Sequence, residues 1–206
     1  MIKLLIFDYD GVIFDTADIA YNLVKKECNK YCKAPIKTRQ DFMDVYKINF
    51  YESMKKRGVK KEDMKKIIKE SLEILSKKKL RIHPGMKSAV KKLSQTHSLA
   101  VVSSNYDIVM KKNLKKHGIL ECFDFILGTE AGKSKQQKVK SLLKNEKLSF
   151  PEAVFITDTV GDIKEAKKAK VKAMAVTWGF HTKQMLKNAK PDFIVQKPSQ
   201  MTEVLV

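Results

Sequence analysis

Two aspartates near the start of the chain, Asp8 and Asp10, have the spacing of residues that act together in chemistry. They directly follow an apolar run, Leu4 to Phe7, and Gly11 comes next. The run predicts a buried strand that ends abruptly, and residues two apart on a strand share a face. Two neighbouring carboxylates repel each other unless a cation lies between them. The pair therefore indicates a divalent-metal site at a strand end, with an ordinary acidic turn as the alternative reading.

A second acidic pair, Asp158 and Asp162, follows another apolar run at residues 153–156. Together with Asp8 and Asp10 it would bring four carboxylates from two strands into one cluster. Hard oxygen ligands without a nearby set of His or Cys ligands favour Mg²⁺ over zinc. The sequence therefore predicts a magnesium site built from these four aspartates.

Apolar strands alternate with amphipathic helices along most of the chain. Besides the first strand, the pattern predicts strands at 98–103, 125–127, 153–156, 173–176 and 193–195, with helices between them. This order is typical of right-handed βαβ units, and therefore of an α/β fold with a parallel sheet. In such sheets ligands bind beyond the carboxyl ends of the strands, where Asp8, Ser103 and Asp158 are expected.

Residues 16–81 interrupt this alternation, because the stretch shows helical patterns only. Its strongest predicted helix covers 62–78, with an apolar side formed by Met64, Ile67, Ile68, Ser71, Leu72 and Leu75. The sequence thus predicts two parts, a core formed by residues 1–15 and 82–206 and an inserted α-helical cap at 16–81.

The charge balance is strongly basic, with 42 Lys and Arg against 23 Asp and Glu, a net charge of +19. Such a charge can attract nucleic acid or anionic substrates. However, only three of the 42 are Arg, and the lysines fall in scattered pairs on the polar faces of predicted helices. Because arginine-rich base readout and a stacking platform are both missing, the composition argues against nucleic acid and for a solvated surface that could concentrate phosphorylated substrates.

The remaining composition indicates a soluble, cytoplasmic protein. No stretch approaches the eighteen or so apolar residues of a membrane span, and Asp8 and Asp10 interrupt the only apolar run near the start. The three cysteines, Cys28, Cys32 and Cys122, form no Cys-x-x-Cys motif and are expected to be reduced.

Taken together, these motifs resemble the haloacid dehalogenase superfamily. The segment Asp8-Tyr-Asp10-Gly11-Val12 is similar to the first motif of the family, Val101-Val-Ser103 to the second, and Asp158 to Asp162 to the fourth. The resemblance covers essentially the whole chain. It is strongest to the subfamily with a helical cap after the first motif, which includes phosphoglycolate phosphatase and β-phosphoglucomutase, and it implies a Rossmann-like three-layer core.

The resemblance also implies a role for each motif residue. Asp8 would be the nucleophile that forms an aspartyl-phosphate, and Asp10 the general acid and base. Asp8, the carbonyl of Asp10, Asp158 and Asp162 would hold Mg²⁺, directly or through water. Phosphoryl oxygens would bind Ser103 and the backbone N–H groups of Ser104 and Asn105.

The motif lysine has two candidates, because the prolines that often follow it in the family are absent. Ser134 is a predicted N-cap with Gln137 in capping-box position, which places Lys135 in the first helical turn, facing the site. Lys133 is the alternative. A second departure is Thr157, where relatives usually have Gly.

The sequence predicts a Mg²⁺-dependent phosphatase acting on a small phosphorylated metabolite, similar to phosphoglycolate phosphatase. A phosphomutase of the β-phosphoglucomutase type is one alternative. A non-enzymatic protein that binds nucleic acid or other anions on the same scaffold is another. The cap residues Tyr21, Lys47 and Arg57 could reach a substrate, and Trp178-Gly179-Phe180 could line the rim of the site. The four histidines, at positions 83, 97, 117 and 181, are interpreted as surface or packing groups.

Overall fold

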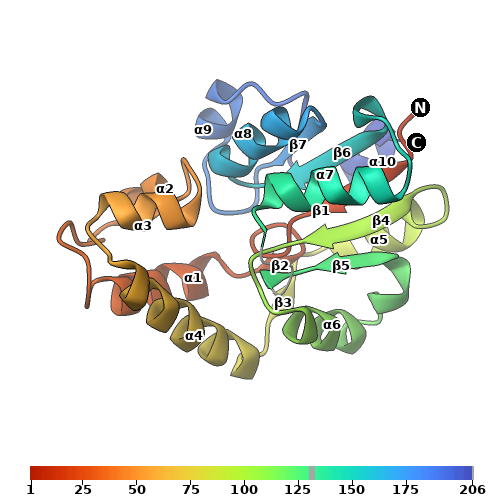
Figure 1. Ribbon diagram of the computed structural model, residues 1–206. Helices are drawn as coiled ribbons and strands as arrows, with labels where there is room; N and C mark the ends of the chain where they lie inside the picture. Colours follow the sequence, from red (N-terminus) through yellow and green to blue (C-terminus); the bar gives the residue numbers. More distant parts are fainter. Residues whose placement is uncertain (130–132, 206) are drawn as a thin grey trace.

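The centre of the protein is a six-stranded parallel sheet with the strand order β5-β4-β1-β6-β7-β8. A computed structural model describes residues 1–129 and 133–205 (Figure 1). All strands predicted from the sequence are present, which confirms the α/β class. They are β1 (Leu4–Phe7), β4 (Ser98–Val102), β5 (Phe125–Leu127), β6 (Ala153–Thr157), β7 (Lys172–Val176) and β8 (Phe193–Val195).

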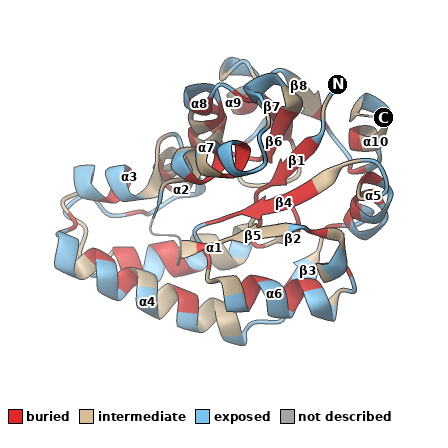
Figure 2. Ribbon diagram, turned by 45° about the vertical axis from the view of Figure 1, so that its right-hand side comes forward, coloured by how far each residue is buried: buried red, intermediate tan, exposed pale blue. Residues whose placement is uncertain are grey.

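Alternation along β1 builds a core on each face of the sheet, because neighbouring strand residues point to opposite sides. Leu5 and Phe7 belong to one buried cluster, whereas Leu4 and Ile6 belong to the other. Figure 2 shows the central strands buried between the two layers of helices. One layer contains α5 (Met86–Leu93), α6 (Asp107–Lys116) and α10 (Ser199–Leu205), and the other contains α7 (Lys135–Asn145), α8 (Val160–Ala169) and α9 (Lys183–Asn188). Two short 3₁₀ turns, η2 (Leu120–Cys122) and η4 (Phe150–Glu152), precede β5 and β6.

Up to residue 80 the regular elements of the predicted insertion are all helical, and the insertion lies beside the sheet at the left of Figure 1. Its own apolar cluster includes Phe42, Val45, Met54 and Ile67, all buried. The boundaries at 15/16 and 81/82 stay a prediction. The elements of the insertion, called the cap below, are α1 (Ala17–Leu23), the π-helical turn η1 (Val24–Cys28), α2 (Arg39–Val45), α3 (Phe50–Lys56) and α4 (Lys61–Lys77).

A small antiparallel ladder joins the two ends of the cap where the chain leaves and re-enters the core. It pairs β2 (Phe14–Asp15) with β3 (Arg81–Ile82), and the guanidinium of Arg81 lies 2.9 Å from the carboxylate of Asp15. The ladder was not predicted, because two-residue strands are too short to show a period. Within the described residues, none of the helices has the length and apolar character needed to cross a bilayer.

The packing of β1 predicts a clear difference between two isoleucines. Ile6 is fully buried, whereas Ile108 on α6 is 74% exposed. We expect Ile6→Ala to lower the free energy of unfolding by about 2–5 kcal/mol, since it leaves a cavity in a closed core. Ile108→Ala should change it by less than about 0.5 kcal/mol. Chemical denaturation of both variants measures the difference, and equal losses would contradict this description of the core.

Candidate active site

Asp8 directly follows β1 at the carboxyl edge of the sheet, where its carboxylate is almost fully buried. One oxygen, Oδ1, accepts a hydrogen bond of 2.7 Å from the backbone N–H of Tyr9. The other, Oδ2, accepts one of 2.6 Å from the Nζ of Lys135. Burial raises the pKa of Asp8, and the ammonium of Lys135 opposes that shift. The carboxylate is therefore held in one orientation, as a nucleophile would require.

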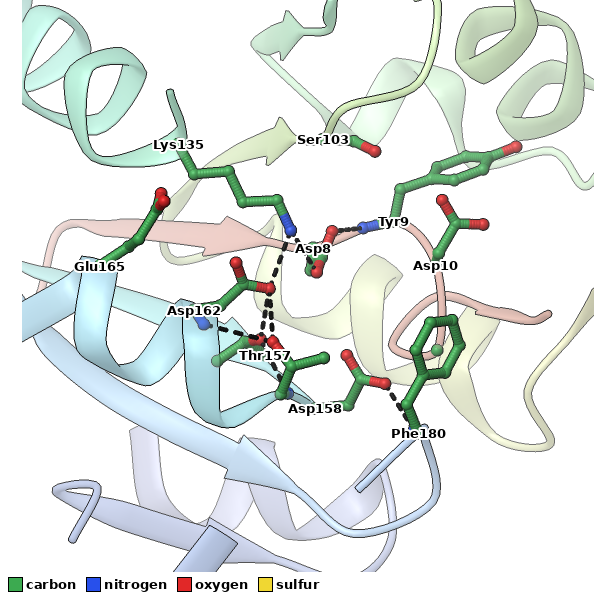
Figure 3. Close-up of polar contacts among 12 residues, drawn as sticks. Asp8, Tyr9, Asp10, Ser103, Lys135, Thr157, Asp158, Asp162, Glu165 and Phe180 are labelled. Carbon is green, nitrogen blue, oxygen red and sulfur yellow. Dashed lines mark hydrogen bonds and ion pairs between the residues drawn. The ribbon is translucent and has the colours of Figure 1, made fainter. Parts of the chain in front are cut away.

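Lys135 is the lysine that reaches the site, as the capping argument predicted. Ser134 caps α7 in a capping box with Gln137, so Lys135 is the first residue of the helix. Figure 3 shows its side chain extending between Asp8 and Asp162, and its Nζ is 2.8 Å from the Oδ2 of Asp162. Burial lowers the pKa of Lys135, but the two carboxylates more than compensate and hold it above its usual value. The alternative, Lys133, is exposed and donates to the hydroxyl of Ser141.

Asp10 lies two residues beyond Asp8 and has a different environment. Its Oδ2 accepts a hydrogen bond of 3.3 Å from the side-chain amide of Asn105. Burial raises the pKa of Asp10, while hydrogen bonding by Thr16 and Asn105 and the charge of Lys135 oppose the shift. A carboxyl whose pKa is raised retains its proton to higher pH, which suits a general acid.

Ser103 and Asn105 bring a second loop to the same cavity. Ser103 follows β4, and its hydroxyl accepts a hydrogen bond from the backbone N–H of Asn105 at 3.1 Å. Both residues are buried, Ser104 between them is exposed, and all three line the cavity that contains Asp8 and Asp10. The predicted phosphate loop is thus next to the acidic pair, and its binding role stays a prediction.

Asp158 follows β6, and backbone segments lie close to its carboxylate on two sides. Its Oδ2 accepts a hydrogen bond of 2.7 Å from the N–H of Phe180. A Cβ on Gly11 or Gly179 would lie 2.0 or 2.2 Å from the same oxygen, so neither position has room for a larger residue. Burial raises the pKa of Asp158 to about 7. Its other oxygen, Oδ1, is buried and has no hydrogen-bond partner among the residues that the structure describes.

Asp162, in the first turn of α8, is bonded chiefly to its own neighbours. Its Oδ2 accepts hydrogen bonds from Thr157 and Thr159 at 3.1 and 2.9 Å, in addition to the bond from Lys135. Although burial acts against it, the charge of Lys135 and these bonds keep the pKa of Asp162 below its usual value. Thr157 therefore helps to hold this carboxylate.

A Mg²⁺ site in which the carboxylates of Asp8 and Asp158 bind the ion directly fits the structure better than one in which all four aspartates do. Across residues 1–129 and 133–205, no three Asp, Glu, His or Cys side chains are close enough to bind one ion together. Mg²⁺ needs only one or two carboxylates, because water and substrate phosphate complete its shell. The Oδ1 of Asp158, which is buried and has no hydrogen-bond partner within residues 1–129 and 133–205, offers a hard oxygen ligand of the kind that Mg²⁺ prefers.

The cap is joined to the core close to this site by hydrogen bonds to backbone carbonyls. At the end of α2, the carbonyl of Tyr46 accepts a hydrogen bond of 2.8 Å from the N–H of Gly161. A Cβ on Gly161 would lie 2.8 Å from that oxygen. His181 Nδ1 accepts from the N–H of Val160 at 2.9 Å, so its Nε2 donates to the carbonyl of Met43 at 2.8 Å. His181 thus bridges the two parts of the protein.

Sequence reasoning missed the roles of two buried side chains near the site. Lys138 is 3% exposed and donates to the carbonyl of Ser103 at 2.6 Å. It lies one turn after Lys135, a spacing that puts both on one helix face, which was the available signal. The bridge made by His181 had no such signal, because its partner Met43 is remote in sequence.

The three candidate cap residues do not line the cavity found among the described residues. Tyr21 stacks with Arg39, Lys47 pairs with Asp44, and Arg57 donates to two backbone carbonyls. Of the segment 178–180, Phe180 lines the cavity, whereas the indole of Trp178 packs on the core and donates to the carbonyl of Val12.

The bridge predicts that two histidines differ in their effect on stability. His181→Leu would leave the buried N–H of Val160 without its acceptor, and it would remove one of two donors from the carbonyl of Met43, which keeps the N–H of Tyr46 at 3.0 Å. We expect it to lower the free energy of unfolding by about 2–3 kcal/mol. His97→Leu, at a half-buried surface turn, should have little effect. Thermal or chemical denaturation of both variants measures this, and amide exchange at Val160 should accelerate only in the first. Identical behaviour of the two variants would contradict the bridge.

Comparison with known proteins agrees with the fold and the motifs. Residues 5–176 match the profile of the haloacid dehalogenase-like hydrolase family. Phosphoglycolate phosphatase of Synechococcus elongatus is 22% identical over 204 residues, 98% of this chain and 96% of that protein. Pyrophosphatase PpaX of Listeria innocua is 21% identical over 210 residues, covering 99% and 96%.

Among solved structures, a predicted phosphatase from Clostridium acetobutylicum has the same fold. It superposes with a TM-score of 0.83 at 21% identity, and the match covers 100% of this chain and 98% of that one. Because the family profile spans most of the chain, including both acidic motifs, the protein belongs to the haloacid dehalogenase-like hydrolases.

Proposed function

We propose that the protein is a Mg²⁺-dependent phosphatase that hydrolyses a small phosphomonoester through an aspartyl-phosphate on Asp8. The proposal depends on one observation, which is that three features line the same cavity. They are the buried carboxylate of Asp8, which Lys135 orients, the carboxyl of Asp10, whose pKa is raised, and the Ser103–Asn105 loop. The names of the relatives, a phosphoglycolate phosphatase and a pyrophosphatase, support phosphoryl transfer as the chemistry.

In the first step, an oxygen of Asp8 attacks phosphorus, and the bond between phosphorus and the ester oxygen breaks. Asp10 donates its proton to the leaving oxygen, which departs as an alcohol. Lys135 offsets the negative charge that the phosphoryl oxygens carry in the transition state. Ser103 and the N–H groups that follow it orient those oxygens.

In the second step, water attacks the phosphorus of the aspartyl-phosphate. The carboxylate of Asp10 accepts a proton from that water, and the bond between phosphorus and Asp8 breaks to release phosphate. Asp8 is thereby restored as a carboxylate and Asp10 as an acid. The two residues can divide these roles because their environments differ: Lys135 contacts Asp8, whereas Asn105 contacts Asp10.

Asp8, Asp158 and the backbone carbonyl of Asp10 are the groups that would hold the metal, with Asp162 behind them. Bound there, Mg²⁺ would place positive charge next to the phosphoryl oxygens and keep the carboxylates of Asp8 and Asp158 ionised. The feature that best supports this assignment is the buried Oδ1 of Asp158, to which no group in the described part of the chain donates a hydrogen bond.

The nucleophile can be tested against an aspartate of the same segment. Asp8→Asn should lower kcat/KM for an aryl phosphate by at least about three orders of magnitude, as removal of a nucleophile does elsewhere. Asp15→Asn, which alters only the ladder contact with Arg81, should retain activity. EDTA should abolish wild-type turnover, and added Mg²⁺ should restore it. Undiminished activity of Asp8→Asn, or turnover indifferent to EDTA, would refute the mechanism.

The choice between the two lysines makes a separate prediction. Lys135→Met removes the ammonium from both Asp8 and Asp162, and we expect kcat to fall about 10²–10³-fold. Lys133→Met removes an exposed side chain bonded to Ser141, and kcat should stay within about twofold of wild type. Steady-state kinetics on the same aryl phosphate decides between them. The reverse ranking would assign the motif lysine to Lys133.

A further inference from the structure

The cavity above the acidic residues has two chemically different halves. Its volume is about 680 Å³, within the usual range for a small-molecule site. The core half contains the aspartates, the Ser103–Asn105 loop and Lys135. In the cap half, α1 and α4 present mainly apolar side chains, and the end of α2 and the start of α3 add polar ones. The apolar side chains include Leu23, Ile67, Ile68, Leu72 and Leu75, with Phe180 from the core, and the polar ones include Tyr46, Asn49, Tyr51 and Glu52.

The cap half contains no positively charged group. All residues between 16 and 81 are described, and the only charged side chain among those of them that line the cavity is Glu52. The lysines that line it all come from the core: Lys133, Lys135, Lys138 and Lys168. The cap cations considered from the sequence, Lys47 and Arg57, are bonded within the cap. An anionic leaving group facing the cap would therefore have no cation to pair with there.

Successive turns of α4 present their apolar side chains to different surroundings. Met64 and Ile67 belong to the cluster of the cap, whereas the next turns carry Ser71, Leu72 and Leu75 to the cavity. Leu72 is only 6% exposed, so this part of the cavity wall has little contact with water. Transferring an apolar group to such a surface is favourable, and transferring an unpaired charge is costly.

We propose that the substrate is the phosphate monoester of an apolar alcohol, alkyl or aryl, whose hydrocarbon part packs between α1 and α4. The inference rests on the proposed phosphatase function and specifies the leaving group. It separates this protein from the activities in the names of its relatives, because glycolate carries a carboxylate and pyrophosphate has a phosphate as leaving group. Neither would find a cation on the cap.

The test is a chain-length series measured by phosphate release. Ethyl, butyl and hexyl phosphate are compared with 1-naphthyl phosphate, phosphoglycolate and pyrophosphate, using wild type and Asp8→Asn. We expect kcat/KM to rise about fourfold for each added methylene, since burying one contributes roughly 0.8 kcal/mol. The kcat/KM values for hexyl and 1-naphthyl phosphate should exceed those for phosphoglycolate and pyrophosphate. The ratio of the hexyl to the naphthyl value distinguishes an alkyl from an aryl preference.

The failures of the two proposals are distinguishable. If Asp8→Asn abolishes turnover but phosphoglycolate or pyrophosphate is the better substrate, or the chain-length series is flat, the apolar leaving group is wrong and the phosphatase stands. If Asp8→Asn matches wild type on all of the compounds, the proposed function itself fails.

Two neighbouring positions on α4 provide a matched pair of variants. Leu75 lines the cavity and the adjacent Ile74 does not, and both are half-buried. Leu75→Lys should lower kcat/KM for hexyl phosphate at least about tenfold, lower it much less for ethyl phosphate, and raise turnover of phosphoglycolate. Ile74→Lys should leave all three unchanged. Equal losses on ethyl and hexyl phosphate, or equal effects of the two variants, would overturn the proposal.

Discussion

The ammonium group of Lys135 lies between the carboxylates of Asp8 and Asp162, and this contact joins three elements that are far apart in sequence. The ammonium group brings a positive charge from the start of α7 to the end of β1 and the first turn of α8. Buried carboxylates are tolerated only when cations or hydrogen-bond donors face them. The arrangement of the carboxyl edge of the sheet therefore depends on this ion pair, on the N–H groups aimed at Asp8 and Asp158, and on any metal bound there.

The same edge also determines where the cap lies. Gly161, at the start of α8, donates to the carbonyl of Tyr46 at the end of α2, so the positive end of one helix faces the negative end of the other. His181 adds a second bridge through its two ring nitrogens. Because Asp158 and Asp162 belong to the same β6–α8 segment, contacts to the cap and the acidic residues are positioned together.

The core and the cap contribute chemically different side chains to the cavity. The core presents charged and hydrogen-bonding groups whose positions are set by strand ends, as in other parallel sheets. The cap presents an apolar surface from α1 and α4. A phosphoryl group and a hydrocarbon group have opposite requirements for solvation, and the cavity separates these two environments.

Much of the fold could be predicted from the sequence, because strand and helix periods and the capping box around Ser134 are local properties. The strands, the helical insertion and the choice of Lys135 over Lys133 for contact with Asp8 all followed from such patterns. The β2–β3 ladder did not, because two-residue strands show no period.

The sequence by itself determined which residues reach the carboxyl edge of the sheet, since it determined where each strand ends. Only the tertiary structure decided that Asp162 pairs with Lys135, that His181 bridges to Met43, and that no described residue donates a hydrogen bond to the Oδ1 of Asp158. It also decided that one part of the apolar side of α4 packs within the cap, whereas Leu72 and Leu75 line a cavity. These contacts join residues separated by many positions, and no local pattern specifies which distant surface an amphipathic helix will meet.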